Sequence, residues 1–421
     1  MNYVTGVLVV ALSAVVLGNM LLFFAFRTQL LRLWREPVIR LPVVIFESDD
    51  WGAGPLEQAA VLARLRALLA RYSDAHGRHP VMTLGLTLAT PNAGARPARD
   101  PALPVGARRA RDADDYQRTY LDDPEYTPIL EQILRGMDEG VFAAQLHGME
   151  HYFPAVLMDA ASRDPVVRDW LEQGDQYSEL LPDHLQSRWI NALELPSREH
   201  PPAQIESAVT QEVAAFARIF GRLPRVVVPP TFVWTPVVEQ AWSVQGLEYL
   251  VTCGKRFVGR DASGKPVTDG ANFRNGETSN GLRCLVRDVY FEPAKGHSFE
   301  RVLQYLDEYR ACGRPLLLET HRSNFTALNP AADAAFLELD RVLREVLACW
   351  PVVRFLSAEE LGDALVRDDR TLVQGPDEPR LGVWLHRVRG LAPFQRFARL
   401  TGAKLATSLL LLWLRKQDRA H

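Results

Sequence analysis

Short apolar runs alternate with longer amphipathic stretches between about residues 38 and 366. The apolar runs predict strands at 41–47, 81–88, 141–146, 225–228, 248–252, 283–291, 316–319 and 352–355. The stretches with helical spacing predict helices at 56–72, 128–139, 203–220, 236–245, 298–311, 331–349 and 358–366. Because strand and helix alternate, the pattern predicts an α/β fold with a mainly parallel sheet, closed or nearly closed into a barrel.

Three stretches interrupt this alternation and predict insertions in the barrel. Residues 91–123 are rich in Pro, Ala, Arg and Asp and predict a long loop, and residues 152–202 predict an insertion with partial helices. Residues 261–279 are rich in Gly and Asn, which favours a hairpin or a mobile loop. We therefore divide the chain into an N-terminal segment 1–37, a barrel 38–366 and a C-terminal part 367–421.

The N-terminal segment contains an apolar run that predicts a transmembrane helix. Val4–Phe26 has 23 residues and no charged side chain. A helix of this length measures about 35 Å, enough to span a hydrocarbon core of about 30 Å. A cleaved signal peptide is the alternative, but no basic residue precedes the run. Four arginines follow it, at positions 27, 32, 35 and 40. This bias favours a single-pass anchor with a cytoplasmic catalytic domain, and a periplasmic or extracytoplasmic domain is the alternative.

The C-terminal part is basic and contains apolar helical faces. Residues 380–421 carry nine Lys or Arg and a single acid after Arg380, Asp418. Phe394, Phe397 and Leu400 are spaced three apart, and the apolar stretch 405–414 includes Trp413. This combination favours an amphipathic tail on an anionic membrane surface. A solvated helix that covers the barrel is the alternative.

Composition narrows the class of protein only a little further. The chain has 421 residues, 47% of them hydrophobic, and a formal net charge of −3. A large core can therefore form, and no basic excess points to a nucleic-acid partner. Its four cysteines form no CxxC pair, so no zinc-ribbon site is indicated.

Three clusters of titratable residues follow predicted strands. Asp49 and Asp50 come directly after the first strand, and barrel enzymes carry catalytic groups at this end of their strands. His147 and His151 follow the third strand at a spacing of four, which can bring two imidazoles to one metal ion. His321 follows the run 316–319. One Asp with two His suits Zn²⁺ and other divalent first-row ions and leaves room for water and substrate.

This order of Asp-Asp, then His-x-x-x-His, then a late strand ending in His resembles the polysaccharide deacetylase family, carbohydrate esterase family 4. The resemblance covers roughly residues 38–366. It implies a distorted (β/α)7-type barrel, like those of glycoside hydrolases and deacetylases, that uses a divalent metal to remove acetyl groups from N-acetylated sugars.

The resemblance also implies a role for each matching residue. Asp49 corresponds to the catalytic base and Asp50, His147 and His151 to the metal ligands, while His321 corresponds to the general acid. Residues 226–234 resemble the third motif, which shapes one wall of the substrate groove.

The sequence departs from the family pattern at three places. Gly148 replaces the usual Ser or Thr, and Val227 and Val228 stand where the third motif usually carries Arg. No fourth-motif Asp follows 248–252, and Asp288 is a candidate substitute. The support that usually tunes the acid and the base is therefore predicted to be missing.

Aromatic and polar residues near these motifs are candidates for substrate binding. We expect Trp51, Trp234 and Phe232 to stack on sugar rings, a backbone N–H after Pro230 to stabilise the oxyanion, and Asn324 to contact substrate. Glu47 and Trp51 flank the paired acids, and packing is an equally good interpretation of both.

The sequence therefore predicts a metal-dependent hydrolase that de-N-acetylates a sugar in a polysaccharide or a lipid-linked glycan. Zn²⁺ is the favoured ion, with Co²⁺, Ni²⁺ or Mn²⁺ as alternatives. Partners are the acetylated glycan or lipid-linked sugar and membrane lipid, without nucleic acid. Two other functions stay open, namely another metal-dependent C–N or ester hydrolase on the same scaffold and a non-catalytic, membrane-tethered glycan-binding protein.

Overall fold

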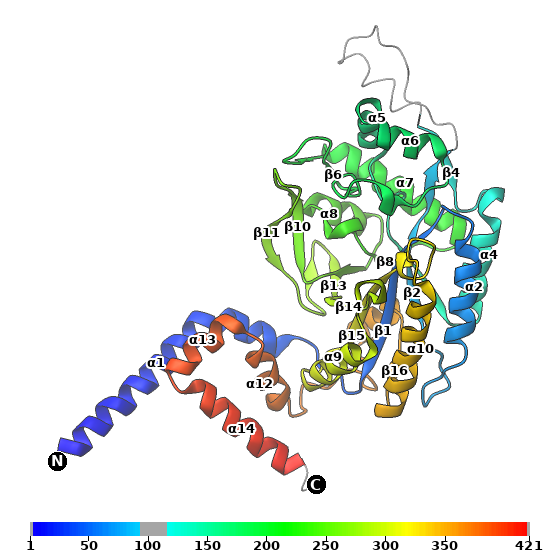
Figure 1. Ribbon diagram of the computed structural model, residues 1–421. Coiled ribbons are helices and arrows are strands. Elements are labelled where there is room, and N and C mark those ends of the chain that lie inside the picture. Colours follow the sequence, from blue (N-terminus) through cyan, green and yellow to red (C-terminus); the bar gives the residue numbers. More distant parts are fainter. Residues whose placement is uncertain (1–2, 93–115, 419–421) are drawn as a thin grey trace. The chain divides into compact units, whose positions relative to one another are not determined.

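A computed structural model describes residues 3–92 and 116–418 (Figure 1). The chain forms two compact units. The larger unit contains residues 42–306 and 315–367, and the smaller unit contains residues 1–41, 307–314 and 368–421.

The larger unit is built on one twisted sheet of parallel strands. In spatial order the path is β12 (Thr278–Ser279), β13 (Leu282–Val286), β9 (Tyr249–Thr252), β8 (Val226–Val227), β5 (Phe142–Leu146), β2 (Met82–Thr87), β1 (Val43–Gly52), β15 (Leu316–His321) and β14 (Val289–Tyr290), with β16 (Arg354–Phe355) also on β1. Every described pair in this sheet is parallel except β12 with β13.

The sheet is curled, and a short connection joins strands near its two ends. Among the described residues no hydrogen-bonded ladder joins β13 to β14, but only Arg287 and Asp288 separate them in the chain. The predicted α/β barrel is therefore confirmed as a nearly closed sheet. The predicted strand 283–291 is broken in two at these residues, because its two halves pair with opposite ends of the sheet.

Helices cover the outside of the sheet (Figure 1). They are α2 (Gln58–Leu69), α4 (Thr127–Asp138), α7 (Pro202–Phe220), α8 (Pro236–Val244), α9 (Phe299–Ala311), α10 (Ala332–Cys349) and α11 (Ala358–Arg367). Each bound lies within a few residues of the predicted one. Helix α10 shows why, since its buried Phe336, Leu339, Leu343 and Val346 recur at helical spacing and bury one face of the helix.

The interruptions in the barrel pattern have secondary structure of their own. Residues 152–202 contain α5 (Pro154–Arg163), α6 (Pro165–Gln173) and the strand pair β6 (Ile190–Asn191) and β7 (Arg198–Glu199). Strands β10 (Lys255–Arg260) and β11 (Pro266–Asn272) form a hairpin. Most of the predicted loop 91–123 lies outside the described residues, but within it β4 (Arg118–Tyr120) pairs with β3 (Ala89–Pro91), so these residues form strands where a loop was predicted.

The smaller unit is helical and combines both ends of the chain. Its long helix α1 (Tyr3–Arg35) packs against α12 (Leu381–Arg389) and α13 (Ala392–Leu400), and α14 (Ala403–Asp418) follows. Buried Arg387 donates to the backbone carbonyls of Leu33, Glu36, Pro37, Cys312 and Gly313, which ties these segments together. Residues Ser13–Arg35 of α1 form a stretch that is long and apolar enough to cross a membrane.

Candidate active site

The paired acids lie within β1, on a bulge that turns both toward the mouth of the barrel. Ser48 and Trp51 pair with Leu84 and Leu86 of β2, so β1 carries one extra residue at this point. Asp50 has φ +75°, a left-handed conformation that Asp tolerates better than most residues. We expected the strand to end before the acids. It continues instead, because the bulge accommodates them inside the sheet.

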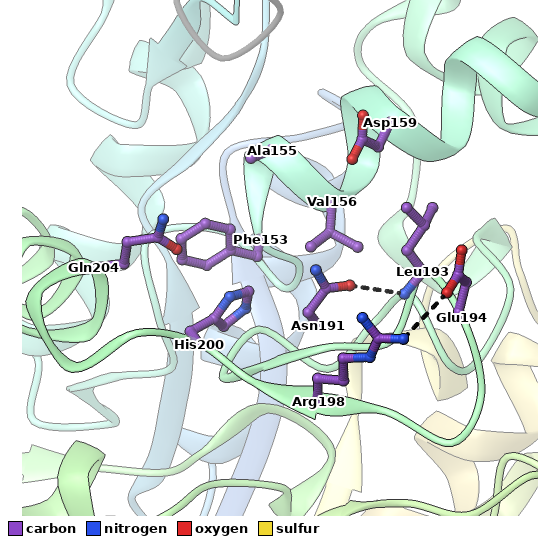
Figure 2. Close-up of a pocket in the computed structure, with 10 residues that line it drawn as sticks. All are labelled: Phe153, Ala155, Val156, Asp159, Asn191, Leu193, Glu194, Arg198, His200 and Gln204. Carbon is purple, nitrogen blue, oxygen red and sulfur yellow. Dashed lines mark hydrogen bonds and ion pairs between the residues drawn. The ribbon is translucent and has the colours of Figure 1, made fainter. Parts of the chain in front are cut away.

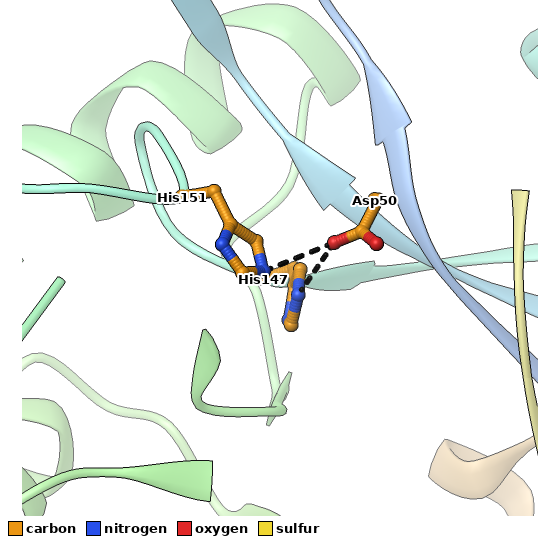
Figure 3. A group of neighbouring side chains, drawn as sticks. All are labelled: Asp50, His147 and His151. Atoms are coloured by element: carbon orange, nitrogen blue, oxygen red, sulfur yellow. Dashed lines mark ion pairs between the residues drawn. The ribbon is translucent and has the colours of Figure 1, made fainter. Parts of the chain in front are cut away.

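Asp50, His147 and His151 meet at the carboxyl ends of β1 and β5 (Figure 3). Asp50 Oδ1 lies 3.2 Å from His147 Nε2 and 3.1 Å from His151 Nε2, and all three side chains are buried. Ligands at 2.0–2.2 Å from a tetrahedral ion lie about 3.3–3.6 Å apart, so small shifts of these side chains would admit an ion.

Two further features fit a cation at this site. Apart from these two imidazole contacts, buried Asp50 Oδ1 has no hydrogen-bond partner within the described part of the chain. The His147 Nδ1 nitrogen lies 2.9 Å from the carbonyl oxygen of Val228, which fixes the ring with Nε2 toward Asp50.

Gly148 has φ +113°, a conformation that disfavours a side chain, so its departure from Ser or Thr follows from the local backbone.

Asp49 is held by a buried arginine from another part of the chain. Arg287 donates from Nη1 to Asp49 Oδ1 at 3.1 Å and from Nη2 to Asp49 Oδ2 at 2.5 Å. Burial alone would raise the pKa of Asp49, but Arg287, His147 and His321 together outweigh it and hold that pKa below the ordinary value. The predicted loss of support for the base is therefore wrong, since Arg287 supplies it from the break between β13 and β14.

Arg287 also faces two more buried carboxylates, from the adjacent strands β1 and β15. Glu47 and Glu319 are direct neighbours in the parallel register. Arg287 Nη1 lies 3.1 Å from Glu47, and Arg287 Nε lies 3.5 Å from Glu319. Burial raises the pKa of Glu47 to about 7, against the opposing charge of Arg287. One guanidinium therefore compensates three carboxylates inside the barrel.

His321 is paired with Glu292 and not with Asp288, the predicted candidate for the fourth-motif acid. Its Nδ1 lies 2.6 Å from Glu292 Oε1, while Asn324 donates from Nδ2 to Glu292 Oε2 at 2.6 Å. Burial lowers the pKa of His321, but Glu292 and other nearby carboxylates outweigh this and raise it to about 10. Glu292 takes the position for which Asp288 was considered. Asn324, predicted to contact substrate, is buried beside Glu292 and is not among the residues that line the pocket.

These groups line one pocket of about 220 Å³. It contains Asp49, Asp50, His147, His151, Arg287, Glu292 and His321 together with Thr231 and Phe232.

Of the aromatic residues expected to contact sugar, Phe232 lines this pocket. Trp51 and Trp234 are fully buried, and their indole N–H groups donate to Ser48 and Glu239, so neither ring presents a face to a ligand. Pro230 is buried as well, and the residue after it, Thr231, lines the pocket.

Gly85 of β2 leaves the space that Asp49 occupies. A Cβ at this position would lie 2.4 Å from Asp49 Oδ1. We expect Gly85→Ala to displace the carboxylate and to lower the rate of the deacetylation that the motif resemblance implies by about 10²-fold, because a shift of about 1 Å in a catalytic group costs this much. Bound metal should be retained. Gly390→Ala is a suitable control because its added Cβ would make only an ordinary contact. Equal rates in both variants would contradict the assignment of Asp49.

Comparison with known proteins gives structural neighbours only. No family profile and no curated protein matches the sequence. Similar solved structures include a family 4 carbohydrate esterase from Streptomyces lividans in complex with acetate, at 12% identity and TM-score 0.33, covering 74% of this chain and 90% of that one. A putative polysaccharide deacetylase from Mycobacterium smegmatis shows 12% identity and a TM-score of 0.38, and the match covers 79% of this chain and 94% of that one. A peptidoglycan deacetylase from Bacillus subtilis shows 11% identity and a TM-score of 0.35, and the match covers 80% of this chain and 95% of that one. At these identities and TM-scores we base the functional proposal on the side chains of the site.

Proposed function

We propose that this protein is a metal-dependent hydrolase that removes acetyl groups from an N-acetylated sugar in a polysaccharide or lipid-linked glycan. The observation that carries the proposal is the convergence of five predicted side chains on one pocket. Asp50, His147 and His151 form a cation site, with Asp49 and His321 in the walls beside it. The motif resemblance supports acetyl groups as the target.

The site supplies each group that amide hydrolysis requires. A divalent ion held by Asp50, His147 and His151 would polarise the carbonyl and lower the pKa of a bound water. Asp49, kept ionised by Arg287, accepts the proton of the attacking water. His321, kept protonated by Glu292, donates a proton to the leaving amine.

Two nitrogens and one carboxylate oxygen favour Zn²⁺ among divalent ions, and Co²⁺, Ni²⁺ and Mn²⁺ accept the same donors. Elemental analysis of the purified protein, followed by an assay of acetate release from N-acetylated oligosaccharides, tests the proposal. We expect about one ion per chain and metal-dependent release. Hydrolysis of simple esters or other amides without acetate release from any N-acetylated sugar would refute the deacetylase assignment.

The pairing of His321 with Glu292 predicts a change in pH dependence. In Glu292→Gln the negative charge beside His321 is lost, so the pKa of His321 falls and the general acid loses its proton at lower pH. The alkaline limb of the rate profile should move down by about 1–3 pH units. Glu300→Gln, on the exposed face of α9, should leave the profile unchanged. An unmoved alkaline limb in Glu292→Gln would show that His321 is not the acid.

We further propose that α1 anchors the protein in a membrane and that α13 and α14 lie in the interface. Helix α1 has 33 residues and measures about 50 Å, so about 20 Å of it extends beyond a hydrocarbon core of about 30 Å. Phe26 and Leu30, in the C-terminal half of α1, pack with Phe394 of α13. Asn19 donates to the carbonyl of Thr401, at the turn between α13 and α14.

The α13–α14 hairpin presents apolar side chains to its surroundings. Leu400, Leu405, Leu409 and Trp413 are each more than half exposed. Arg396, Arg399 and Lys404 on the same hairpin are also exposed, which suits an anionic lipid surface. Anchoring would bring the pocket to lipid-linked sugars or membrane-associated glycan. The arginines after the span favour the cytoplasmic face, and a periplasm-specific reporter fused after Arg40 would be active if this is wrong.

A polarity-sensitive fluorophore tests the interfacial hairpin. Leu409→Cys, in a chain with Cys349→Ser, should give blue-shifted emission once the full chain is reconstituted into anionic vesicles, because the label enters the acyl boundary. Val244→Cys is the control, since Val244 is 76% exposed in the larger unit. A label at position 409 that is as hydrated as the label at position 244 would contradict the interfacial placement.

A further inference from the structure

A second pocket lies in the insertion that follows the metal-binding histidines. It measures about 270 Å³ and is bounded by the first turns of α5, the β6–β7 segment and the start of α7 (Figure 2). It shares no lining residue with the pocket that holds the cation site. The deacetylation mechanism uses none of its side chains.

His200 gives this pocket an unsatisfied polar group. Its imidazole stacks on Phe153, with ring centroids 4.0 Å apart and an angle of 28° between the rings. The residue is only 5% exposed, and Nε2 makes no hydrogen bond within the described residues. Burial lowers the pKa of His200 to about 4, so the ring is neutral at physiological pH. A hydroxyl group can satisfy Nε2 in either tautomer, because it both donates and accepts.

The other walls combine apolar surface with neutral hydrogen-bonding groups. Val156 and Leu193 supply apolar surface, and Asn191 and Gln204 carry carboxamides. The Asn191 oxygen accepts from the backbone N–H of Leu193 at 3.1 Å, which leaves its NH₂ group for a ligand. Figure 2 shows Gln204 beside Phe153 and His200, with Leu193 across the pocket.

Charge argues against an ionic ligand in this pocket. Arg198 is the one basic side chain besides His200 among its lining residues, and it lies 3.6 Å from Glu194. Asp159 adds a second carboxylate and disfavours an anion. A cation would lack a buried acid, because Glu194 is exposed and is shared with Arg163 and Arg198. Apolar patches with amide and imidazole groups are the chemistry that binds an uncharged, polyhydroxylated ring.

We propose that this pocket is a second carbohydrate-binding site, which takes one neutral pyranose unit of the glycan whose acetyl group is removed at the cation site. The proposal rests on the proposed function for the identity of that glycan. Phe153 follows the metal ligand His151 by two residues, so their Cα atoms lie no more than about 7 Å apart. A glycan held in the second pocket would therefore be retained beside the catalytic pocket, which favours polymeric over monomeric substrates.

Binding is tested with the full chain carrying Asp50→Ala, so that turnover does not interfere. The probes are neutral tetrasaccharides of N-acetylglucosamine, N-acetylgalactosamine and glucose, titrated by calorimetry. At least one should bind, and adding Gln204→Ala should weaken it about 3- to 10-fold, the effect of one lost hydrogen bond. Gln211→Ala is the matched control, because Gln211 is an exposed glutamine on the same helix outside the pocket. His200→Ala should weaken binding by about tenfold or more.

A second measurement separates this proposal from the proposed activity. In the otherwise unaltered enzyme, Gln204→Ala should raise KM for an acetylated tetrasaccharide. It should leave kcat and KM for an acetylated monosaccharide unchanged. Equal affinities of the Gln204→Ala and Gln211→Ala chains, or no binding of any probe, would overturn the second site and leave the deacetylase proposal intact. Selective weakening in a protein that releases no acetate would support the sugar site and refute the activity.

Discussion

Asp50→Ala is expected to lose bound metal and acetate release together, whereas His321→Ala should keep the metal and lose about 10²–10⁴-fold in rate. The difference follows from geometry. Asp50 Oδ1 faces both imidazole Nε2 atoms at 3.1–3.2 Å, so its removal takes away one of three ligands. His321 lies in the pocket wall and is bound to Glu292, outside the ligand group.

The comparison is made on the purified 421-residue chain by elemental analysis and by single-turnover acetate release. His79→Ala provides a control, because His79 is a half-buried histidine whose ring contacts the Tyr72 carbonyl, away from the pocket. Tight metal retention in a folded chain in which Asp50, His147 and His151 are all replaced would contradict their assignment as metal ligands. Loss of metal in His321→Ala would instead make His321 a ligand and leave the acid unassigned.

Local patterns predicted the elements of the barrel because those elements follow local rules. Helix α10 was predicted at 331–349 and is found at 332–349, since its apolar spacing marks both its face and its length. The three strand ends that carry Asp49, His147 and His321 come together because parallel strands place their carboxyl ends on one side of the sheet. The cation site could therefore be assembled from the order of its motifs.

The partners of Asp49 and His321 could not be found in the same way. Arg287 is 238 positions from Asp49, and no spacing rule connects them until the chain between β13 and β14 is known to join strands near opposite ends of the sheet. A signal was present, since Arg287 interrupts the predicted strand 283–291, but a charge in a strand is usually solvated. The predicted exposure of Trp51 to a sugar could not be checked from the sequence for a related reason. Strand β1 is buried on both faces, so alternation does not say which of its side chains reach the pocket.

Arg287→Met should produce the largest loss of stability among the variants considered, about 3–5 kcal/mol near pH 8. The substitution keeps an apolar side chain of similar length but leaves Glu47, Asp49 and Glu319 buried without the guanidinium that they share. Their pKa values should rise in the folded state and stay ordinary in the unfolded state. Protons are then bound preferentially by the folded chain, so the loss should be small near pH 4 and should grow as pH rises toward 8.

Urea unfolding of the detergent-solubilised chain between pH 4 and pH 8 measures this dependence. Arg218→Met removes an exposed ion pair with Asp122 and should cost about 0–1 kcal/mol at any of these pH values. Adding Glu47→Gln and Glu319→Gln to Arg287→Met should restore part of the stability, because two buried charges are removed. It should not restore acetate release, because Asp49 still lacks the guanidinium that keeps it ionised. A pH-independent loss in Arg287→Met would mean that Arg287 acts through packing alone, and full recovery of activity in the triple variant would remove it from the support of the base.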